Sequence, residues 1–246
     1  MCKNNPYDDP LFFEAYSQMG RSTQGLAGAG EWYALRELLP DLAGKRVLDL
    51  GCGYGWHCQY AAQGGASYVL GLDISEKMLQ VAREKNRFDQ VEYRCQSIDE
   101  IDFAADSFDV VLSSLALHYL PDFQDICRRV AGCLTVGGQF ILSVEHPVFT
   151  AYGSQDWYRD EQGNILHWPV DGYYIEGERQ AIFLGQPVQK YHHTATSFVQ
   201  GLLQNGFVLT DFVEPRPDPS MMDLPGMQDE LRRPMMLLLA GRLERR

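Results

Sequence analysis

Apolar residues in the first part of the chain alternate between two spacings. Short segments of strand length predict strands at residues 46–50, 68–72, 91–94, 107–112 and 139–145, and the apolar run of the fourth is continuous, as in a central parallel strand. Between these runs, apolar residues recur three or four apart, as in amphipathic helices. A capping Ser75 precedes one such stripe, and another runs from Phe123 to Leu134, where Gly137-Gly138 is expected to end the helix. Strict alternation of strands and helices predicts a parallel sheet with helices on both faces.

The rest of the chain departs from this alternation. Residues 11–39 carry two helical stretches joined by a glycine-rich segment that we expect to be flexible. Residues 146–193 are rich in Tyr, Trp, Gly and Pro and show no long periodic run. Within them, the short apolar pieces 172–175 and 181–184 are candidates for the strands of a hairpin. After a further helix, two last strands are predicted at residues 207–213 and 235–243.

Composition narrows the classes of protein that fit this pattern. The chain has 246 residues, of which 45% are apolar, so it can form one domain with a sizeable core. Its net charge of −12 argues against a nucleic-acid partner, because phosphate binding needs a basic face. The chain shows neither a membrane-length apolar run nor a signal peptide, so we expect a cytoplasmic protein without a membrane partner. Its six cysteines form no C-x-x-C pair, which predicts buried thiols and no metal site.

Residues 46–73 carry the most specific motif of the chain. A buried strand leads into a turn that contains Gly51 and Gly53, a helix follows, and a second strand ends at Asp73. Glycines let a backbone pass close to a ligand, and an acid after the second strand can accept hydrogen bonds from ribose hydroxyls. The unit is therefore typical of a nucleoside site. A nicotinamide site of the G-x-G-x-x-G type would need a third glycine where Trp56 stands.

The run from Asp49 to Gly55, D-L-G-C-G-Y-G, resembles the first motif of the S-adenosylmethionine-dependent methyltransferases with a Rossmann-like fold. Three further segments are similar to motifs of that family: residues 102–111 to its acidic fourth-strand motif, residues 113–119 to its S-x-x-A-L-H-H segment, and residues 134–138 to its L-K-P-G-G turn, with Val136 in place of proline. The resemblance is close over residues 45–145 and looser over residues 194–243.

This resemblance implies a fold and an activity. The fold would be α/β, with a doubly wound, seven-stranded and mostly parallel sheet whose last strand is antiparallel, in a single domain. The expected parts are a helical lid at residues 1–44, a cofactor-binding core at 45–145, an aromatic insertion after the fifth strand at 146–193, and a final helix with two strands at 194–246. The activity would be transfer of a methyl group from S-adenosylmethionine to a small-molecule acceptor by in-line displacement.

The resemblance also implies which residues contact the cofactor. Asp73 would take the ribose hydroxyls, Ile74 would pack on the adenine, and Arg21 would pair with the carboxylate. The full set of expected cofactor contacts is Tyr16, Arg21, Asp49, Gly51, Cys52, Gly53, Asp73, Ile74, Met78, Ser97, Ile98, Ser114 and Leu115. His118 after the fourth strand and His146 after the fifth are the expected catalytic bases, because ligands of open parallel sheets bind beyond the carboxyl ends of the strands.

The insertion is expected to form the acceptor side of the pocket. It starts at the carboxyl end of the fifth strand and is rich in amphipathic aromatic residues. These aromatic residues are Tyr152, Trp157, Tyr158, Trp168, Tyr173 and Tyr174. A small satellite core and a homodimer contact are the alternatives for them. For the whole chain, the alternative functions are a nicotinamide-dependent oxidoreductase and a non-catalytic module that binds the cofactor.

Overall fold

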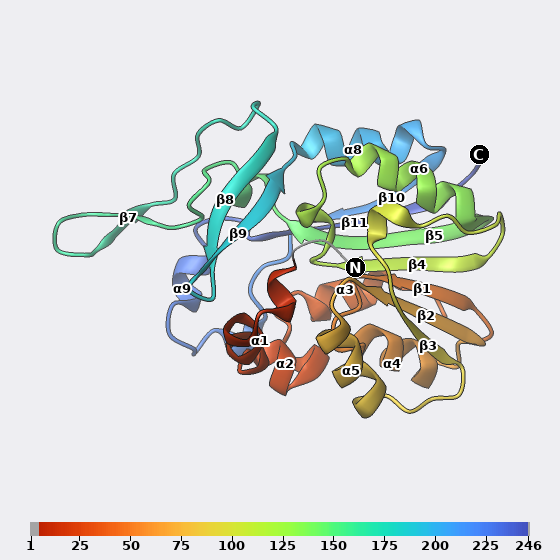
Figure 1. Cartoon of the computed structure of the whole chain (residues 1–246). Coiled ribbons are helices and arrows are strands. Elements are labelled where there is room, and N and C mark those ends of the chain that lie inside the picture. Colours follow the sequence, from red (N-terminus) through yellow and green to blue (C-terminus); the bar gives the residue numbers. More distant parts are fainter. Residues whose placement is uncertain (1–4, 246) are drawn as a thin grey trace.

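The computed structural model describes residues 5–245, and a seven-stranded sheet lies at its centre (Figure 1). The strands follow the order β10-β11-β5-β4-β1-β2-β3 across the sheet. Their bounds are β1 Arg46–Leu50, β2 Tyr68–Asp73, β3 Val91–Cys95, β4 Phe108–Ser114, β5 Leu134–Glu145, β10 Phe207–Val213 and β11 Met236–Leu243. Strands β1 to β5 pair in parallel, and β11 lies antiparallel between β5 and β10. The predicted fold class is confirmed.

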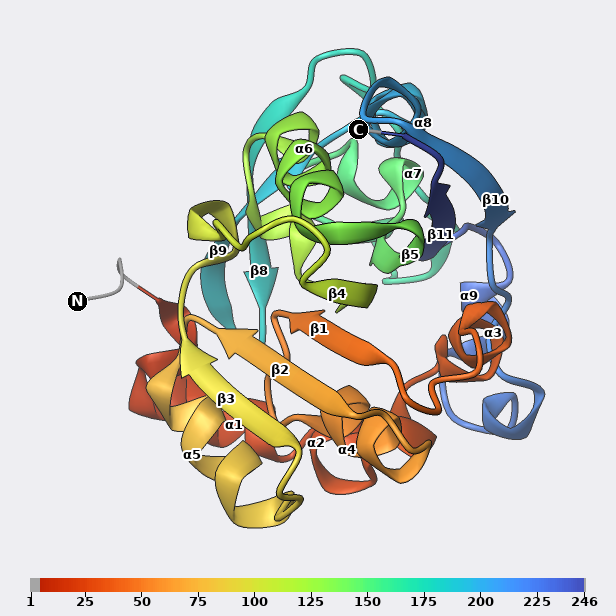
Figure 2. The ribbon, with the colours of Figure 1, turned by 90° about the vertical axis from the view of Figure 1, so that its right-hand side faces the viewer.

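Helices cover both faces of this sheet. Figures 1 and 2 show α3, α4 and α5 on one face and α6 and α8 on the other. The helices are α1 Pro10–Ser17, α2 Gly20–Thr23, α3 Trp32–Leu38, α4 Trp56–Gln63, α5 Glu76–Lys85, α6 Phe123–Cys133, α7 Pro147–Thr150, α8 Ala195–Gln204 and α9 Met227–Glu230. Short 3-10 turns are η1 Pro6–Asp8, η2 Gly25–Gly28, η3 Ile98–Glu100, η4 Leu117–Tyr119 and η5 Pro219–Met221.

Successive side chains of the central strands alternate between the two layers. Leu48 and Leu50 of β1 belong to the buried cluster that includes Ile126 of α6. Val47 belongs to the cluster on the other face, around Leu35 of α3. Because both faces of β1 are covered, its run of apolar residues is nearly continuous, as the sequence pattern predicts for a central parallel strand. Within residues 5–245, no helix combines the length and apolarity needed to cross a bilayer.

The glycine-rich segment between α1 and α3 is folded, which corrects its predicted flexibility. It forms α2 and η2, whose backbones approach each other closely. A Cβ atom at Gly28 would lie 2.3 Å from the carbonyl oxygen of Gly20. Such an approach excludes any side chain, so glycine here allows tight backbone packing rather than disorder.

One predicted helix boundary is wrong. Helix α6 ends at Cys133, and β5 begins directly at Leu134, opposite Phe108 of β4. Leu134 is buried among the same apolar residues that the helix packs against, so its position in the apolar stripe fits either element. Apolar periodicity alone cannot separate the last turn of a helix from the first residue of a buried strand.

The insertion contains two hairpins in place of the predicted pair of strands. Strand β8, Gly177–Phe183, pairs with β9, Gln186–His192, through a turn in which Leu184 and Gly185 both have positive φ (52° and 74°). Residues 172–175, predicted as a strand, form a loop instead. The second hairpin joins β6 Tyr158–Arg159 to β7 Ile165–His167 and projects from the molecule (Figure 1).

Arg233, between α9 and β11, holds the insertion against the C-terminal part of the chain. Its guanidinium carbon lies 4.2 Å from the ring centroid of Trp168, 4.7 Å from that of Phe149 and 5.1 Å from that of Trp157. It also pairs with Glu230 through hydrogen bonds of 2.8 and 3.0 Å. Attraction between a cation and aromatic rings strengthens when both are desolvated, and Arg233 is buried. This satellite core accounts for two of the aromatic residues expected in the pocket.

We expect Arg233→Met to lower the free energy of unfolding by about 2–3 kcal/mol, because it removes the ring contacts and leaves Glu230 unpaired. Urea unfolding measures the change. Arg232→Met is the matched control, since Arg232 also lies 5.1 Å from the Trp157 ring but is partly exposed. That change should cost less than about 1 kcal/mol. Equal losses in the two variants would contradict a special role for the packing around Arg233.

Candidate functional site

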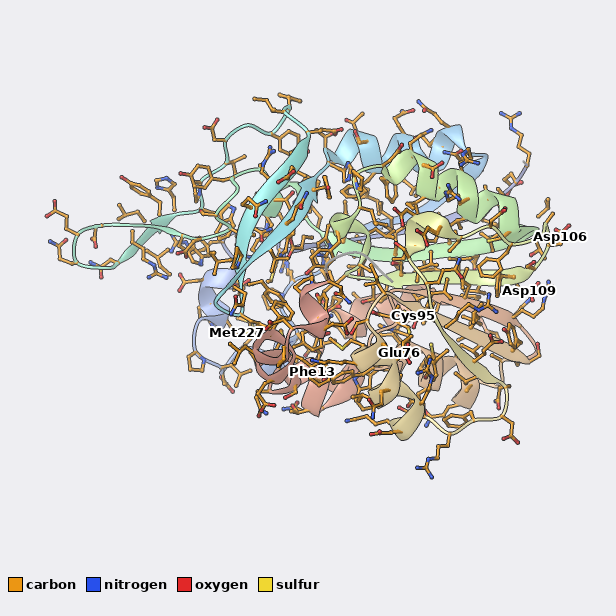
Figure 3. The ribbon with its side chains drawn as sticks, viewed as in Figure 1. Phe13, Glu76, Cys95, Asp106, Asp109 and Met227 are labelled. Atoms are coloured by element: carbon orange, nitrogen blue, oxygen red, sulfur yellow. The ribbon has the colours of Figure 1, made fainter. Side chains whose placement is uncertain are left out.

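A cavity of about 800 Å³ lies beyond the carboxyl ends of the parallel strands, where open α/β sheets bind ligands. We divide it by the elements that line it. The nucleoside half consists of residues 5–6, 16, 19, 21, 51, 53, 73–74, 78, 96–98 and 114–116. The hairpin half consists of residues 7, 118–120, 145, 183, 187–191 and 235–236. Figure 3 shows Asp106 and Asp109 near the amino end of β4, at the other end of the sheet.

The glycine turn after β1 brings backbone against Asp73 at the end of β2. Gly53 donates its N–H to Asp73 Oδ2 at 2.8 Å, and Ser75 donates its N–H to Asp73 Oδ1 at 2.9 Å. Gly51 has a φ of 77°, and a Cβ atom there would lie 2.4 Å from Cβ of Ala116. The turn therefore requires glycine for both conformation and space. The carboxylate of Asp73 is fixed, and its remaining lone pairs are available to hydroxyl groups.

The residues before α1 form a wall of the nucleoside half. Ser75, the N-cap of α5, donates its hydroxyl to Asp8 Oδ1 at 2.7 Å. Lys77 Nζ donates to the carbonyl oxygen of Asp8 at 2.7 Å. These bonds hold η1 against the start of α5, so that Pro6 and Tyr7 line the cavity. The predicted helical lid thus includes a segment ahead of its first helix.

An ion pair lies at the end of the nucleoside half next to the glycine turn. Arg21 Nη2 donates to both carboxylate oxygens of Glu31, at 2.7 and 3.0 Å. The Ser114 hydroxyl lies 3.4 Å from Glu31 Oε1. Glu31 is buried, and a second cavity of about 60 Å³ opens here, with Cys52 in its lining. A cation and an anion fixed side by side suit a ligand end that carries both charges.

The hairpin half is built around a buried charge pair. Lys190 of β9 donates to Glu145 Oε1 at 2.5 Å and to Gln155 Oε1 at 3.0 Å. Gln155 closes the triangle by donating to Glu145 Oε2 at 2.6 Å. Burial acts to raise the pKa of the Glu145 carboxyl. The charge of His118 when protonated, the charge of Lys190 and the hydrogen bonds from Lys190 and Gln155 outweigh it, and that pKa lies below its usual value. Glu145 is thus held as a carboxylate at the carboxyl end of β5.

His118 lies beside this pair. Its Nε2 is 4.0 Å from Glu145 Oε1, and its Nδ1 has no hydrogen-bond partner among residues 5–245. Burial lowers the pKa of His118 to about 4, although the nearby Glu145 opposes this shift. The ring is therefore neutral at neutral pH. The hydroxyl of its neighbour Tyr119 forms a hydrogen bond of 3.0 Å with the hydroxyl of Tyr7, and both residues line the cavity.

Most of the residues predicted to contact the cofactor line the cavity together. These are Tyr16, Arg21, Gly51, Gly53, Asp73, Ile74, Met78, Ser97, Ile98, Ser114 and Leu115. Two others lie elsewhere. Asp49 is buried beneath the glycine turn, where Oδ2 accepts a hydrogen bond from the Cys58 thiol (3.3 Å), and burial raises its pKa to about 7. Cys52 lines the smaller cavity beside Glu31.

The two predicted bases are placed differently. His118 lines the cavity, whereas His146 is not among its lining residues. His146 caps the short helix α7: its Nδ1 accepts the N–H of Val148 at 3.0 Å, and its Nε2 lies 2.8 Å from Glu214 Oε1. Both ring nitrogens are therefore engaged in structure. The position just after β5 is correct, but the cap turns the ring away from a role in the cavity.

The insertion contributes to the cavity through different residues from those predicted. None of Tyr152, Trp157, Tyr158, Trp168, Tyr173 and Tyr174 is a lining residue. The cavity instead receives Phe183 and residues 187–191 from the β8–β9 hairpin. Sequence reasoning missed Tyr7, Glu31, Glu145 and Lys190. Of these four, only Glu145 has a position that could have indicated a site, because it ends a strand as Asp73 does.

Comparison with known proteins gives consistent results. Residues 48–142 match a family model described as "Methyltransferase domain". A crystal structure of an S-adenosylmethionine-dependent methyltransferase from Mesorhizobium loti is 42% identical, with a TM-score of 0.82, and the match covers 89% of this chain and 100% of that one. A Listeria monocytogenes protein described as a candidate S-adenosylmethionine-dependent methyltransferase is 55% identical, with a TM-score of 0.86, over 90% of this chain and 100% of that one.

One relative that matches over a shorter stretch is named for its reaction. The ubiquinone biosynthesis O-methyltransferase of Coxiella burnetii is 34% identical over 113 residues. That match covers 45% of this chain and 48% of the relative, so the chain spans about half the length of this relative.

Proposed function

The chain belongs to the S-adenosylmethionine-dependent methyltransferases, and on that premise we propose that its methyl acceptor is a small molecule bound in the hairpin half of the cavity. Family membership decides between the predicted activities: it supports methyl transfer from S-adenosylmethionine over the alternative of a nicotinamide-dependent oxidoreductase. Family membership leaves open which compound accepts the methyl group and which residues bind it.

The lining of the nucleoside half fits S-adenosylmethionine. Asp73 would accept hydrogen bonds from the ribose hydroxyls, and Ile74 with Ile98 offers apolar walls for the adenine. Arg21 and Glu31 carry the two charges that would meet the carboxylate and ammonium of the methionine end. At Gly53, no described atom lies within 4 Å of the place a Cβ would take, so the backbone there can approach the ligand closely. When bound, the cofactor supplies a methyl group on a positively charged sulfur.

The hairpin half is the place left for the acceptor. It continues from the nucleoside half within one cavity and holds the neutral His118. In the proposed reaction the acceptor's heteroatom forms its bond to the methyl carbon, the sulfur keeps the electron pair of the bond that breaks, and His118 takes the acceptor's proton. The imidazolium so formed would face Glu145, whose carboxylate stabilises it. Positioning and exclusion of water supply the rest of the catalysis.

The single observation that carries this proposal is a cavity lined both by Asp73 and by a buried histidine with an unpartnered nitrogen. The test supplies purified protein and S-adenosylmethionine with either the small-molecule filtrate of a bacterial extract or its macromolecular fraction. Release of S-adenosylhomocysteine should depend on the filtrate. Release only with the macromolecular fraction would overturn the proposal.

We expect the affinity for S-adenosylmethionine to fall as the pH drops through about 6. Burial, together with the charge of Asp8, raises the pKa of Asp73 to about 6, against the effect of the N–H donors of Ser75 and Gly53. Above that pH the carboxylate can accept two ribose hydroxyls, and below it protonation removes an acceptor, so the affinity should drop by up to about tenfold per pH unit. Calorimetric titrations at a series of pH values measure it.

Two variants show which carboxyl group is responsible for this pH dependence. Asp73→Asn should bind more weakly and lose the dependence near pH 6. Asp49→Asn should keep it, although Asp49 lies nearby and titrates in the same range, with a pKa of about 7. If Asp49→Asn abolished the dependence instead, Asp73 would not be the group responsible.

A further inference from the structure

The charges in the hairpin half cancel. Among the described residues that line it, Lys190 and Glu145 are the charged side chains, and they form an ion pair with an N–O distance of 2.5 Å. Both are nearly enclosed, with 4% and 13% of their side-chain surface exposed. Gln155 takes a further hydrogen bond from Lys190 and donates one to Glu145. The pair is therefore internally satisfied and offers no free charge to a ligand.

A charged acceptor would meet an unfavourable environment here. Moving a carboxylate, phosphate or ammonium out of water is costly unless a partner of opposite charge receives it. Lys190 is already neutralised by Glu145, and Arg21, the cation of the nucleoside half, is neutralised by Glu31. The hairpin half consequently selects against acceptors with a net charge.

The walls of the hairpin half favour a ring. Phe183 and Tyr119 contribute aromatic rings to this lining, and the Lys190 Nζ is 5.3 Å from the ring centroid of Phe183 and 6.0 Å from that of Tyr119. Tyr7 packs edge-on against Tyr119, with centroids 6.2 Å apart. Met235 and Met236 add adaptable thioether surface. Aromatic and thioether walls gain most from a flat apolar body.

The polar groups available to a ligand are neutral. His118 lines this half as a neutral ring that can accept one proton or one hydrogen bond, and the paired hydroxyls of Tyr7 and Tyr119 can exchange one partner for a ligand. An acceptor that matches this set carries an O–H or a ring N–H. Aliphatic ammonium groups fit poorly, because they would enter charged and find no free anion.

We propose that the methyl acceptor is an uncharged aromatic or heteroaromatic compound that is methylated on a hydroxyl oxygen or ring nitrogen, because Lys190 and Glu145 neutralise each other and leave the hairpin half without a free charge. The inference rests on the small-molecule function proposed above. The nucleophilic atom bonds to the methyl carbon, its proton passes to His118, and no oxidant or further reactant is required.

The test uses binding to the 246-residue chain saturated with S-adenosylhomocysteine, so it needs no knowledge of the natural acceptor. Three probes share the naphthalene ring and carry a neutral, an anionic or a cationic substituent: naphthol, naphthoate and naphthylmethylammonium. Ligand-observed NMR should give a dissociation constant for naphthol at least about tenfold lower than for the two ions. Tighter binding of either ion, or binding of none of the three, would overturn the inference.

Variants then connect the selectivity to the charge pair. Glu145→Gln keeps the hydrogen-bonding shape but frees the charge of Lys190, so naphthoate affinity should rise by about tenfold or more. Glu176→Gln is the control, because Glu176 binds Thr194 and Ser197 outside the cavity, and the probe order should not change. An unchanged naphthoate affinity in Glu145→Gln would overturn the role of the pair.

A double variant guards against misfolding, since a single buried charge left unpaired is strongly destabilising. Glu145→Gln/Lys190→Met removes both charges and should retain the preference for naphthol. Preference for an ion in this variant would contradict the inference. Methylation of a small acceptor without a ring would overturn the inference alone, whereas a macromolecular acceptor would also overturn the proposed function.

Discussion

His118→Asn should lower the turnover number by about 10²–10⁴-fold while leaving the affinity for S-adenosylhomocysteine unchanged. The asparagine amide has similar polarity and fits the space, but it cannot take a proton. The imidazole of His118 is neutral, because burial lowers its pKa to about 4, and the nearby Glu145 carboxylate would stabilise the ring once it takes a proton. Release of S-adenosylhomocysteine, driven by the filtrate that supports the unchanged protein, measures turnover, and calorimetry measures affinity.

His146→Asn is the matched control for this experiment. His146 follows the neighbouring strand, but its ring caps α7 and binds Glu214. Asparagine can also cap a helix, so the change mainly removes the contact with Glu214, and any loss should appear in unfolding and not in turnover. If His146→Asn reduced turnover as strongly as His118→Asn, the cavity would have been assigned the wrong base. If neither changed it, the acceptor would need no base from these two positions.

The sequence predicts most of the lining of the nucleoside half, because the constraints there are local in sequence. The turn at Gly51 and Gly53 needs glycine for its backbone, and Asp73 is bound by the N–H groups of that turn and of Ser75. Each of these requirements acts within one strand-turn-helix unit, so it leaves a continuous motif. The order of the strands follows from the same alternation of apolar runs.

The hairpin half of the cavity could not be predicted because its residues come from separate segments. Tyr7 precedes the first helix, Glu145 ends β5, and Lys190 lies in a hairpin whose register depends on the turn at Leu184-Gly185. Lys190 can be buried because its ammonium group donates hydrogen bonds to Glu145 and Gln155. A lysine in a polar stretch gives no sign of such a partner before the chain is folded.

The aromatic residues of the insertion show how composition can mislead. Trp157 and Trp168 belong to the closely spaced aromatic residues predicted to line the pocket. In the structure, both pack against Arg233. A cation distant in sequence can draw aromatic rings into a satellite core, and only the fold reveals it. His146 is a similar case, because the residue that precedes a proline at a helix start serves as a cap.

Asp73→Ala should weaken binding of S-adenosylmethionine by about 1.5–3 kcal/mol, or roughly 10–150-fold, through loss of hydrogen bonds to a charged acceptor. The variant also frees the N–H groups of Gly53 and Ser75, which fix the turn, so part of the loss comes from a less ordered site. Calorimetry with S-adenosylmethionine and with its demethylated product should give the same loss, since both carry the ribose. NADH should not compete with either ligand.

Asp109→Ala is the control that separates this effect from general destabilisation. Asp109 pairs with Arg46 at 2.9 Å near the amino end of β4, on the side of the sheet away from the cavity (Figure 3). Because this pair ties β4 to the start of β1, its removal should lower stability and leave cofactor affinity unchanged. Unchanged binding in Asp73→Ala would contradict the ribose contact, and an equal loss in both variants would attribute it to the fold. A loss confined to Asp73→Ala identifies the carboxylate at the end of β2 as the group that holds the nucleoside.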